Sequence, residues 1–210
     1  MNLLHRWLCA SSTWKGTVEK FIVPWVLDGV DLGSDVLEVG PGYGATTDIL
    51  RTRARQLTCV EIDPKLAERL RHRMGDGNVR VICQDATEMV FADESFDSAV
   101  CFTMLHHVPS QSLQDRLLRQ VARILRPGGT FAGTDSLDRK SFRLLHWFDT
   151  CVPVPPDTFA SRLEASGFDA VSVDLNPYAF RFQARKRLSG KPRSTIESAL
   201  VVTGCSSGNG

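Results

Sequence analysis

The chain has 210 residues, of which 42% are hydrophobic and 23% are charged, and its formal net charge at pH 7 is +1. This length suits one domain with a full hydrophobic core, and the near-neutral charge disfavours a protein that binds nucleic acid mainly through electrostatics. No apolar run is long enough to cross a bilayer, and polar residues interrupt the apolar start of the chain, so no signal peptide is expected. These features predict a cytoplasmic globular protein.

Residues 1–34 carry two amphipathic helical patterns and are expected to form an N-terminal helical cap. Pro24 limits or bends the second of these helices. The simpler interpretation is packing against the edge of the main sheet. The alternative places Trp7, Trp14 and Lys15 in a cap over a ligand cleft.

From residue 35 to residue 187 the pattern alternates between strand and helix periods, which indicates one α/β domain. This alternation predicts a doubly wound, mostly parallel sheet with right-handed crossovers and helices on both faces. The expected strands are Val36–Val39, Gln56–Ile62, Val79–Cys83, Ser98–Phe102 and Gly129–Gly133, and the expected helices are Thr46–Arg55, Pro64–Met74 and Leu113–Leu125.

The last third of the chain changes character. Phe142–Cys151 is more apolar than an ordinary loop, and Asp157 is a candidate N-cap for the helix that follows Pro155-Pro156. Two runs of period two, Val171–Leu175 and Ala179–Ala184, predict a C-terminal antiparallel hairpin that closes the sheet. Residues 188–210 are rich in Ser, Gly, Lys and Arg and are expected to be mostly disordered.

The cysteines are scattered, and no Cys-x-x-Cys pair or histidine lies at metal-ligand spacing. Three of them fall inside strand-like runs, where a thiol behaves as a small buried hydrophobe. We therefore expect neither a disulfide framework nor a metal site. The six cysteines are Cys9, Cys59, Cys83, Cys101, Cys151 and Cys205.

Three alternating glycines, Gly40, Gly42 and Gly44, separate the first predicted strand from the next helix. Such a loop lets a ligand touch bare backbone and turns helical N–H groups toward an anionic group. Glu61 ends the second strand about twenty residues later, where a carboxylate can accept both hydroxyls of a ribose. Asp85 ends the third strand and either accepts from an adenine amine or caps the following turn.

Glu38, two residues before Gly40, bears on which ligand the loop holds. A carboxylate beside the loop would repel the pyrophosphate of a dinucleotide by several kcal/mol at an effective dielectric constant of about 20. A ligand with an amine and a sulfonium would be attracted instead. S-adenosylmethionine has these groups, together with a ribose for Glu61 and an adenine for Asp85.

With these motifs, the chain resembles the S-adenosylmethionine-dependent methyltransferases of the Rossmann-like fold, within the small-molecule group of types 11 and 25. The resemblance covers roughly residues 30–187. Its motifs are Val36-Leu37-Glu38-Val39-Gly40-Pro41-Gly42-Tyr43-Gly44, Val60-Glu61-Ile62-Asp63-Pro64, Cys83-Gln84-Asp85-Ala86, Ser95-Phe96-Asp97-Ser98-Ala99-Val100, Leu105-His106-His107-Val108 and Leu125-Arg126-Pro127-Gly128-Gly129-Thr130.

The resemblance implies a seven-stranded sheet whose last strand is antiparallel, and S-adenosyl-L-methionine as co-substrate. It implies that the glycine loop holds the methionine portion, with Glu38 near the amino group. Glu61 would bind the ribose, Ile62 would pack on the adenine, and Asp85 with the Ala86 backbone would contact the adenine edge. The implied cofactor-binding residues are Glu38, Gly40, Gly42, Gly44, Glu61, Ile62, Asp85, Ala86, Phe102 and Thr103, the last two lining the methyl-bearing side.

The predicted reaction is in-line displacement, in which the protein positions the acceptor and excludes water. A base is needed only if the acceptor must lose a proton. His106 and His107, after the fourth strand, are the candidate catalytic residues, and Asp135 after the fifth strand is a further candidate. The alternative for the histidines is an ordinary turn or helix cap.

One missing motif and one apolar segment narrow the class of methyl acceptor. The segment Phe102-Thr103-Met104-Leu105 lacks the Asn/Asp-Pro-Pro-aromatic motif of relatives that methylate nucleobases or glutamine. Phe142–Pro156 and the N-terminal tryptophans are expected to form an apolar lid, which favours a small or lipid-like acceptor over a macromolecule. Two alternatives stay open: an NAD-dependent oxidoreductase, because Gly40-x-Gly42-x-x-Ala45 fits the dinucleotide fingerprint, and a non-catalytic partner subunit that binds S-adenosylmethionine.

Overall fold

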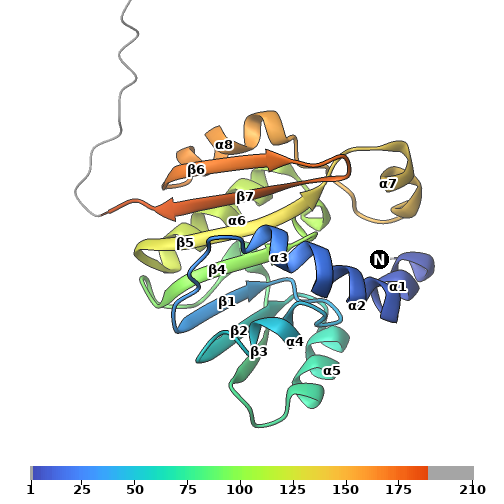
Figure 1. The fold of residues 1–210 in the computed structure, drawn as a ribbon, viewed down its shortest axis with the longest axis horizontal. Coiled ribbons are helices and arrows are strands. Elements are labelled where there is room, and N and C mark those ends of the chain that lie inside the picture. The colour runs from blue at the N-terminus through green and yellow to red at the C-terminus, as the bar shows by residue number, and fades with distance from the viewer. Residues whose placement is uncertain (1, 189–210) are drawn as a thin grey trace, which may run out of the picture.

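The computed structural model describes residues 2–188, with the backbone alone for residues 3–5, so the predicted tail of 188–210 lies almost wholly outside the described residues. The fold is built on a seven-stranded sheet with the order β3-β2-β1-β4-β5-β7-β6 (Figure 1). The strands are β1 (Asp35–Val39), β2 (Gln56–Glu61), β3 (Val79–Cys83), β4 (Phe96–Phe102), β5 (Leu125–Ser136), β6 (Phe168–Leu175) and β7 (Ala179–Lys186).

Strands β1 to β5 are parallel to one another. The strand order reverses at β1, because β2 and β3 lie on one side of it and β4 and β5 on the other. Val39, the last residue of β1, pairs with Val60 of β2 on one side and with Cys101 of β4 on the other. In open α/β sheets a ligand binds outside the carboxyl ends of the strands at such a switch point. The topology therefore places a site beyond β1 and β4.

The C-terminal hairpin closes the sheet as predicted. β7 pairs antiparallel with both β5 and β6, which confirms the mixed seven-stranded sheet. β6 begins at Phe168, three residues before the expected Val171, because its register shifts between Asp169 and Ser172. Ala170 has a φ of 47° there, and this bulge breaks the period-two pattern from which the strand was predicted.

Helices cover both faces of the sheet, as predicted, and each face has its own hydrophobic core. Adjacent residues of β1 point to opposite faces: Val36 packs with Val26 and Leu50, whereas Leu37 packs in the other core. The helices after β1 are α4 (Thr47–Leu50), α5 (Pro64–Met74), α6 (Gln111–Ile124), α7 (Lys140–Leu145) and α8 (Pro156–Ala165).

The start of α8 and the end of α4 differ from the sequence prediction. The N-cap of α8 is Pro155, so Asp157 lies inside the first turn rather than at the cap, because Pro156 already has the fixed φ that suits the first helical position. The helix expected over Thr46–Arg55 ends at Leu50. Beyond it, the Asn78 side chain donates to the carbonyl oxygens of Arg51 and Ala54, both at 2.9 Å.

The N-terminal segment forms α1 (Leu3–Cys9), α2 (Ser12–Thr17), a π-helical turn over Val18–Ile22 and α3 (Val23–Val26). Val23 N–H donates to the Val18 carbonyl in this turn, one residue before Pro24, which has no N–H to donate. α1 and α2 lie beyond the carboxyl ends of the parallel strands, at the same end of the molecule as α7 (Figure 1). Among the residues described, no helix is both long and apolar enough to span a membrane.

Candidate active site

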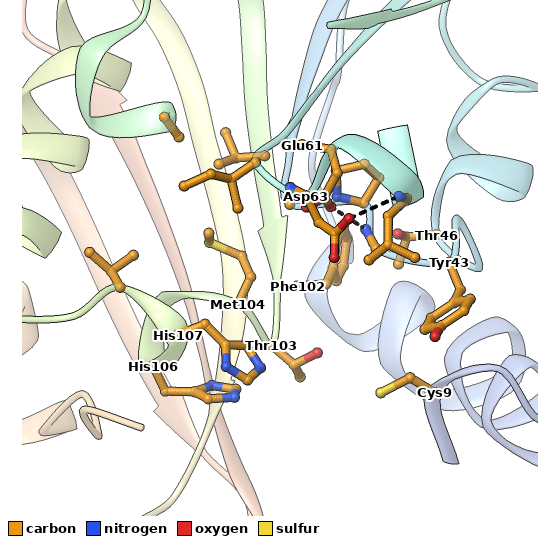
Figure 2. Close-up of a pocket in the computed structure, with 18 of the residues that line it drawn as sticks. Cys9, Tyr43, Thr46, Glu61, Asp63, Phe102, Thr103, Met104, His106 and His107 are labelled. Atoms are coloured by element: carbon orange, nitrogen blue, oxygen red, sulfur yellow. Dashed lines mark hydrogen bonds between the residues drawn. The ribbon is translucent and has the colours of Figure 1, made fainter. Parts of the chain in front are cut away.

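A cavity of about 550 Å³ opens at the carboxyl ends of β1, β2, β3 and β4. Its volume falls within the usual range for small-molecule sites. Residues of α2, the glycine loop, the start of α6 and α7 complete its wall. Figure 2 shows Tyr43 and Cys9 on one side and His106 and His107 on the other, with Thr103 between them.

The glycine loop forms part of this wall, and its glycines have different roles. Gly40 and Gly42 line the cavity with φ values of 68° and 53°. Gly44, with a φ of 76°, is not among the cavity-lining residues. A side chain at Gly44 would come within 2.6 Å of Leu70 Cδ1 and would also meet the Arg73 guanidinium, so this position serves the packing of the loop against α5.

Glu61 joins the end of β2 to the glycine loop. Its side chain accepts from Gly42 N–H at 3.0 Å and from Asp63 N–H at 2.9 Å (Figure 2), and only 6% of the residue is exposed. The carboxylate therefore lies at the cavity wall in a fixed orientation.

The end of β3 and the turn after it supply the neighbouring part of the wall. Asp85 caps the 3₁₀ turn Ala86–Glu88 by accepting from Thr87 N–H at 2.8 Å, and both Asp85 and Ala86 line the cavity. The capping role considered as an alternative for Asp85 is therefore present, and it leaves the residue at the cavity. Ile62 is 65% exposed and presents an apolar side chain on the same wall.

Glu38 is placed differently from the sequence expectation. The residue is 1% exposed and does not line the cavity, because its carboxyl group turns behind the loop to accept from the hydroxyls of Thr46 and Thr47. The Cys59 thiol lies 3.4 Å from the same group. Burial raises the pKa of Glu38 despite these three donors. The argument that a free Glu38 charge selects a cationic ligand therefore has no support in this geometry.

The end of β4 presents Phe102 and Thr103 to the cavity, where the resemblance placed them. Thr103 has a φ of 49°, which is rare for a β-branched residue. Its N–H donates to the Thr134 carbonyl at 2.8 Å, so the pairing with β5 holds this conformation in place. Backbone strain of this kind tends to occur at functional sites.

His106 is buried beside Asp135. Its Nδ1 lies 2.6 Å from Asp135 Oδ1, and its backbone N–H donates to Asp135 Oδ2 at 3.1 Å. Asp135 is completely buried and does not line the cavity, so it fixes His106 rather than facing a ligand. His107 also lines the cavity, and its Nδ1 lies 3.2 Å from the Thr150 carbonyl oxygen.

His146 is a cavity residue that the sequence analysis did not single out. Its Nε2 lies 3.0 Å from His106 Nε2, and its Nδ1 lies 2.8 Å from the Phe142 carbonyl oxygen. Burial lowers the pKa of His146, and the neighbouring His106 acts in the same direction. The only sequence signal was a histidine inside the apolar segment after β5, forty residues from His106.

The N-terminal helices close one side of the cavity. Trp14 lines it, whereas Trp7 is 70% exposed and does not. Lys15 Nζ contacts Asp48 Oδ2 at 2.8 Å and so ties α2 to α4. Cys9 also faces the cavity, and burial raises the pKa of its thiol to about 11, which keeps it protonated at neutral pH.

The comparisons with known proteins point to methyltransferases. Residues 37–133 match the family model described as a methyltransferase domain. The chain is 31% identical over 150 residues to the ubiquinone biosynthesis O-methyltransferase of Pseudomonas putida, across 68% of this chain and 63% of that protein. The corresponding protein of Pseudomonas fluorescens is 30% identical over 148 residues, across 67% and 62%. The chain thus spans less than two thirds of the length of these curated relatives.

Solved structures show the same fold. A methyltransferase from Mesorhizobium loti described as S-adenosylmethionine-dependent superposes with a TM-score of 0.64 at 20% identity, across 75% of this chain and 93% of that chain. The N-methyltransferase NodS from Bradyrhizobium japonicum, solved with S-adenosyl-L-homocysteine, gives a TM-score of 0.63 at 17% identity, across 84% and 87%. Residues 37–133 thus match a methyltransferase domain, and the motifs and strand order of the chain are similar to those of the Rossmann-like S-adenosylmethionine-dependent methyltransferases.

Proposed function

We propose that this chain transfers the methyl group of S-adenosyl-L-methionine to a hydroxyl of a small, largely apolar acceptor in the cytoplasm. The observation that carries the proposal is that one cavity joins two chemically different walls. One wall consists of strand ends and the glycine loop, with the carboxylates of Glu61 and Asp85. The other wall consists of apolar and imidazole side chains, among them Phe142, Leu145, His106 and His146.

The polar wall is the proposed cofactor half. Glu61 would bind the ribose hydroxyls, because its carboxylate is already fixed between the β2 end and the loop. Ile62 would cover one adenine face, and Asp85 with the Ala86 N–H would contact the adenine edge. Gly40 and Gly42 would allow the methionine portion to lie against bare backbone.

The apolar wall is the proposed acceptor half. The co-substrate supplies an already activated methyl group, so the chain has to align the acceptor and keep water out. Thr103 stands at the junction of the two halves (Figure 2). The histidines lie beside the apolar lid residues, where a hydroxyl of the acceptor can lose its proton. The names of the curated relatives, which are O-methyltransferases of ubiquinone biosynthesis, support an oxygen acceptor on a small molecule.

Ligand binding tests the cofactor half directly. Thermal unfolding with S-adenosylmethionine, S-adenosylhomocysteine or NAD should show stabilisation by the two sulfur ligands only. A ligand at 100 times its dissociation constant adds about 2.7 kcal/mol to the free energy of unfolding. Stabilisation by NAD alone would favour an oxidoreductase and overturn the proposal.

Replacing Glu61 tests the ribose assignment. Glu61→Gln keeps an acceptor oxygen near Gly42 but removes the charge, and each hydrogen bond to a charged group contributes about 1.5–3 kcal/mol. We expect S-adenosylhomocysteine to bind more than ten-fold more weakly by calorimetry. Glu68→Gln on the exposed face of α5 is the matched control and should bind normally. Equal affinity of both variants would remove Glu61 from the ribose site.

The acceptor is tested by transfer of a labelled methyl group to fractionated metabolites, lipids, RNA and protein. We expect label in small hydroxylated molecules of low polarity. Label confined to RNA or protein would contradict the acceptor class. Product formation would also exclude a purely binding partner subunit.

A further inference from the structure

Three histidines converge on one point of the cavity wall. His106 and His107 come from the turn after β4, and His146 comes from the segment just after α7. One ring nitrogen from each of the three lies within 4.8 Å of the others. All three residues line the cavity.

The ring contacts of two of these histidines fix where their protons are. His106 Nδ1 faces a carboxylate oxygen of Asp135 at 2.6 Å, and His146 Nδ1 faces the Phe142 carbonyl oxygen at 2.8 Å. Both oxygens are acceptors, so both Nδ1 atoms carry hydrogen, and in the neutral form of either ring the lone pair is on Nε2. These Nε2 atoms are 3.0 Å apart. Two lone pairs at this distance repel unless a proton or another cation lies between them.

We propose that His106, His107 and His146 bind a divalent transition-metal ion such as Zn²⁺ through one imidazole nitrogen each. Zinc–nitrogen bonds of about 2.0–2.1 Å at tetrahedral angles separate two ligand nitrogens by about 3.3 Å. The Nε2 atoms of His106 and His146 are 3.0 Å apart, slightly closer than this value. One ring nitrogen from each of the three histidines lies within 4.8 Å of the others, a limit slightly longer than this value. Small rotations of the rings would bring all three to bonding distance.

The surroundings of the cluster match a metal site in a second respect. A metal-bound histidine usually donates its other N–H to a carboxylate or a backbone carbonyl, which fixes the ring and raises its basicity. Asp135 has this role for His106, and the Phe142 carbonyl has it for His146. Asp135 is fully buried, and Ser136 N–H also donates to its Oδ1 at 2.6 Å.

The proposed metal site would replace the sequence expectation that the chain binds no metal. Two ligands are adjacent in the sequence, and α6, β5 and α7 separate them from the third, so no spacing rule applies to the set. Three protein ligands leave a coordination position on the cavity side, as in catalytic zinc sites. This last step rests on the proposed function: the position would take the hydroxyl oxygen of the acceptor and lower the pKa of that hydroxyl.

Metal binding can be measured without any methyl acceptor. Protein treated with a chelator and desalted is titrated with Zn²⁺ against a chromophoric competitor, and Co²⁺ is used for its visible absorption. We expect one equivalent to bind, with the absorption of four-coordinate Co²⁺. His107→Ala and His146→Ala should each weaken Zn²⁺ affinity at least 100-fold, whereas His72→Ala on α5 should leave it unchanged.

Asp135→Asn tests whether Asp135 acts by positioning His106 rather than by binding the metal itself. Loss of such a partner typically weakens metal affinity 10–100-fold, so this variant should bind with reduced affinity rather than lose binding. Melting curves recorded with chelator show whether each variant is folded. Absence of stoichiometric binding to the wild type, or equal affinity of the His107, His146 and His72 variants, would overturn the proposal. Stabilisation by S-adenosylhomocysteine reports separately on the cofactor half, so failure of one proposal does not resemble failure of the other.

Discussion

Two glutamates at neighbouring strand ends show what residue type and position can predict. Glu38 in β1 and Glu61 in β2 were both expected at the ligand. Glu61 lies at the cavity, because two backbone N–H groups hold its carboxylate there. Glu38 turns away, because the hydroxyls of Thr46 and Thr47 hold it behind the loop. The motif thus predicts position along the strand, whereas local donors decide where the carboxyl group points.

The burial of Glu38 predicts a pH dependence of stability. Its native pKa is raised above the ordinary value of 4.5, so above that pH the folded state retains a proton that the unfolded state has released. The contribution of Glu38 to stability is therefore fully present below pH 4.5 and declines as pH rises toward the native pKa. The slope is at most about 1.4 kcal/mol per pH unit.

Glu38→Gln removes this titration, and its amide oxygen can accept from one threonine hydroxyl while its NH₂ group donates to the other. We expect the variant to gain stability relative to the wild type between pH 5 and pH 8, as measured by denaturant unfolding at several pH values. A stability difference that stays constant across this range would show that Glu38 titrates at its ordinary pKa. Cys59→Ser, which keeps a donor near the same carboxyl group, should retain the wild-type slope.

At the scale of single elements, regular periodicity predicted the core of each strand, and irregular residues decided the ends. β3 and α5 have the boundaries predicted from the sequence. β6 starts early because a bulge interrupts its alternation, and α8 starts at Pro156 because proline suits the first helical turn. The ends of these elements depend on the backbone conformation of one residue. The periodicity of hydrophobic residues, which averages over many positions, does not detect it.

Two glycine substitutions, one in β5 and one in α2, should have opposite effects on the free energy of unfolding. Gly133 lies in β5, where an added Cβ would meet the Cys101 carbonyl and come within 2.7 Å of Phe182 Cζ. Gly133→Ala should therefore destabilise the fold by about 1–3 kcal/mol. Gly16 lies in α2 with nothing within 4 Å, so Gly16→Ala should stabilise it by about 0.5–1 kcal/mol. Urea unfolding measures both, and shifts of the same sign would contradict this account of the packing.

At the scale of the molecule, the alternation of strands and helices was enough to predict the parallel sheet, its closing hairpin and the edge where the site lies. It did not predict the meeting of His146 with His106, because that contact depends on how the segment after β5 folds back over the cavity. The two rings come together only through the path of residues 137–155. Contacts of this kind follow from tertiary packing, and a single sequence offers no periodic signal for them.

Asp48 connects the N-terminal helices to the glycine loop across the molecule. Its carboxylate contacts Lys15 of α2 at 2.8 Å and Arg73 of α5 at 2.8 Å. These two partners hold the pKa of Asp48 below its usual value, although burial opposes the shift. Arg73 in turn donates to the carbonyl oxygens of Tyr43 and Gly44 at 3.0 and 3.1 Å. One carboxylate therefore positions both the α2 side of the cavity and the loop.

Asp48→Asn should loosen the α2 side of the cavity and the glycine loop without unfolding the sheet. The ion pairs are partly exposed, so each contributes at most about 1 kcal/mol, and we expect S-adenosylhomocysteine to bind about two- to five-fold more weakly by calorimetry in 0.1 M salt. In 1 M salt the Debye length falls to about 3 Å, which weakens the same pairs in the wild type, so the two affinities should converge. Asp93→Asn breaks the Asp93–Arg123 pair at the amino end of β4 and should match the wild type at both salt concentrations. A ratio of affinities that does not change with salt would mean that Asp48 acts through hydrogen-bond geometry rather than through its charge.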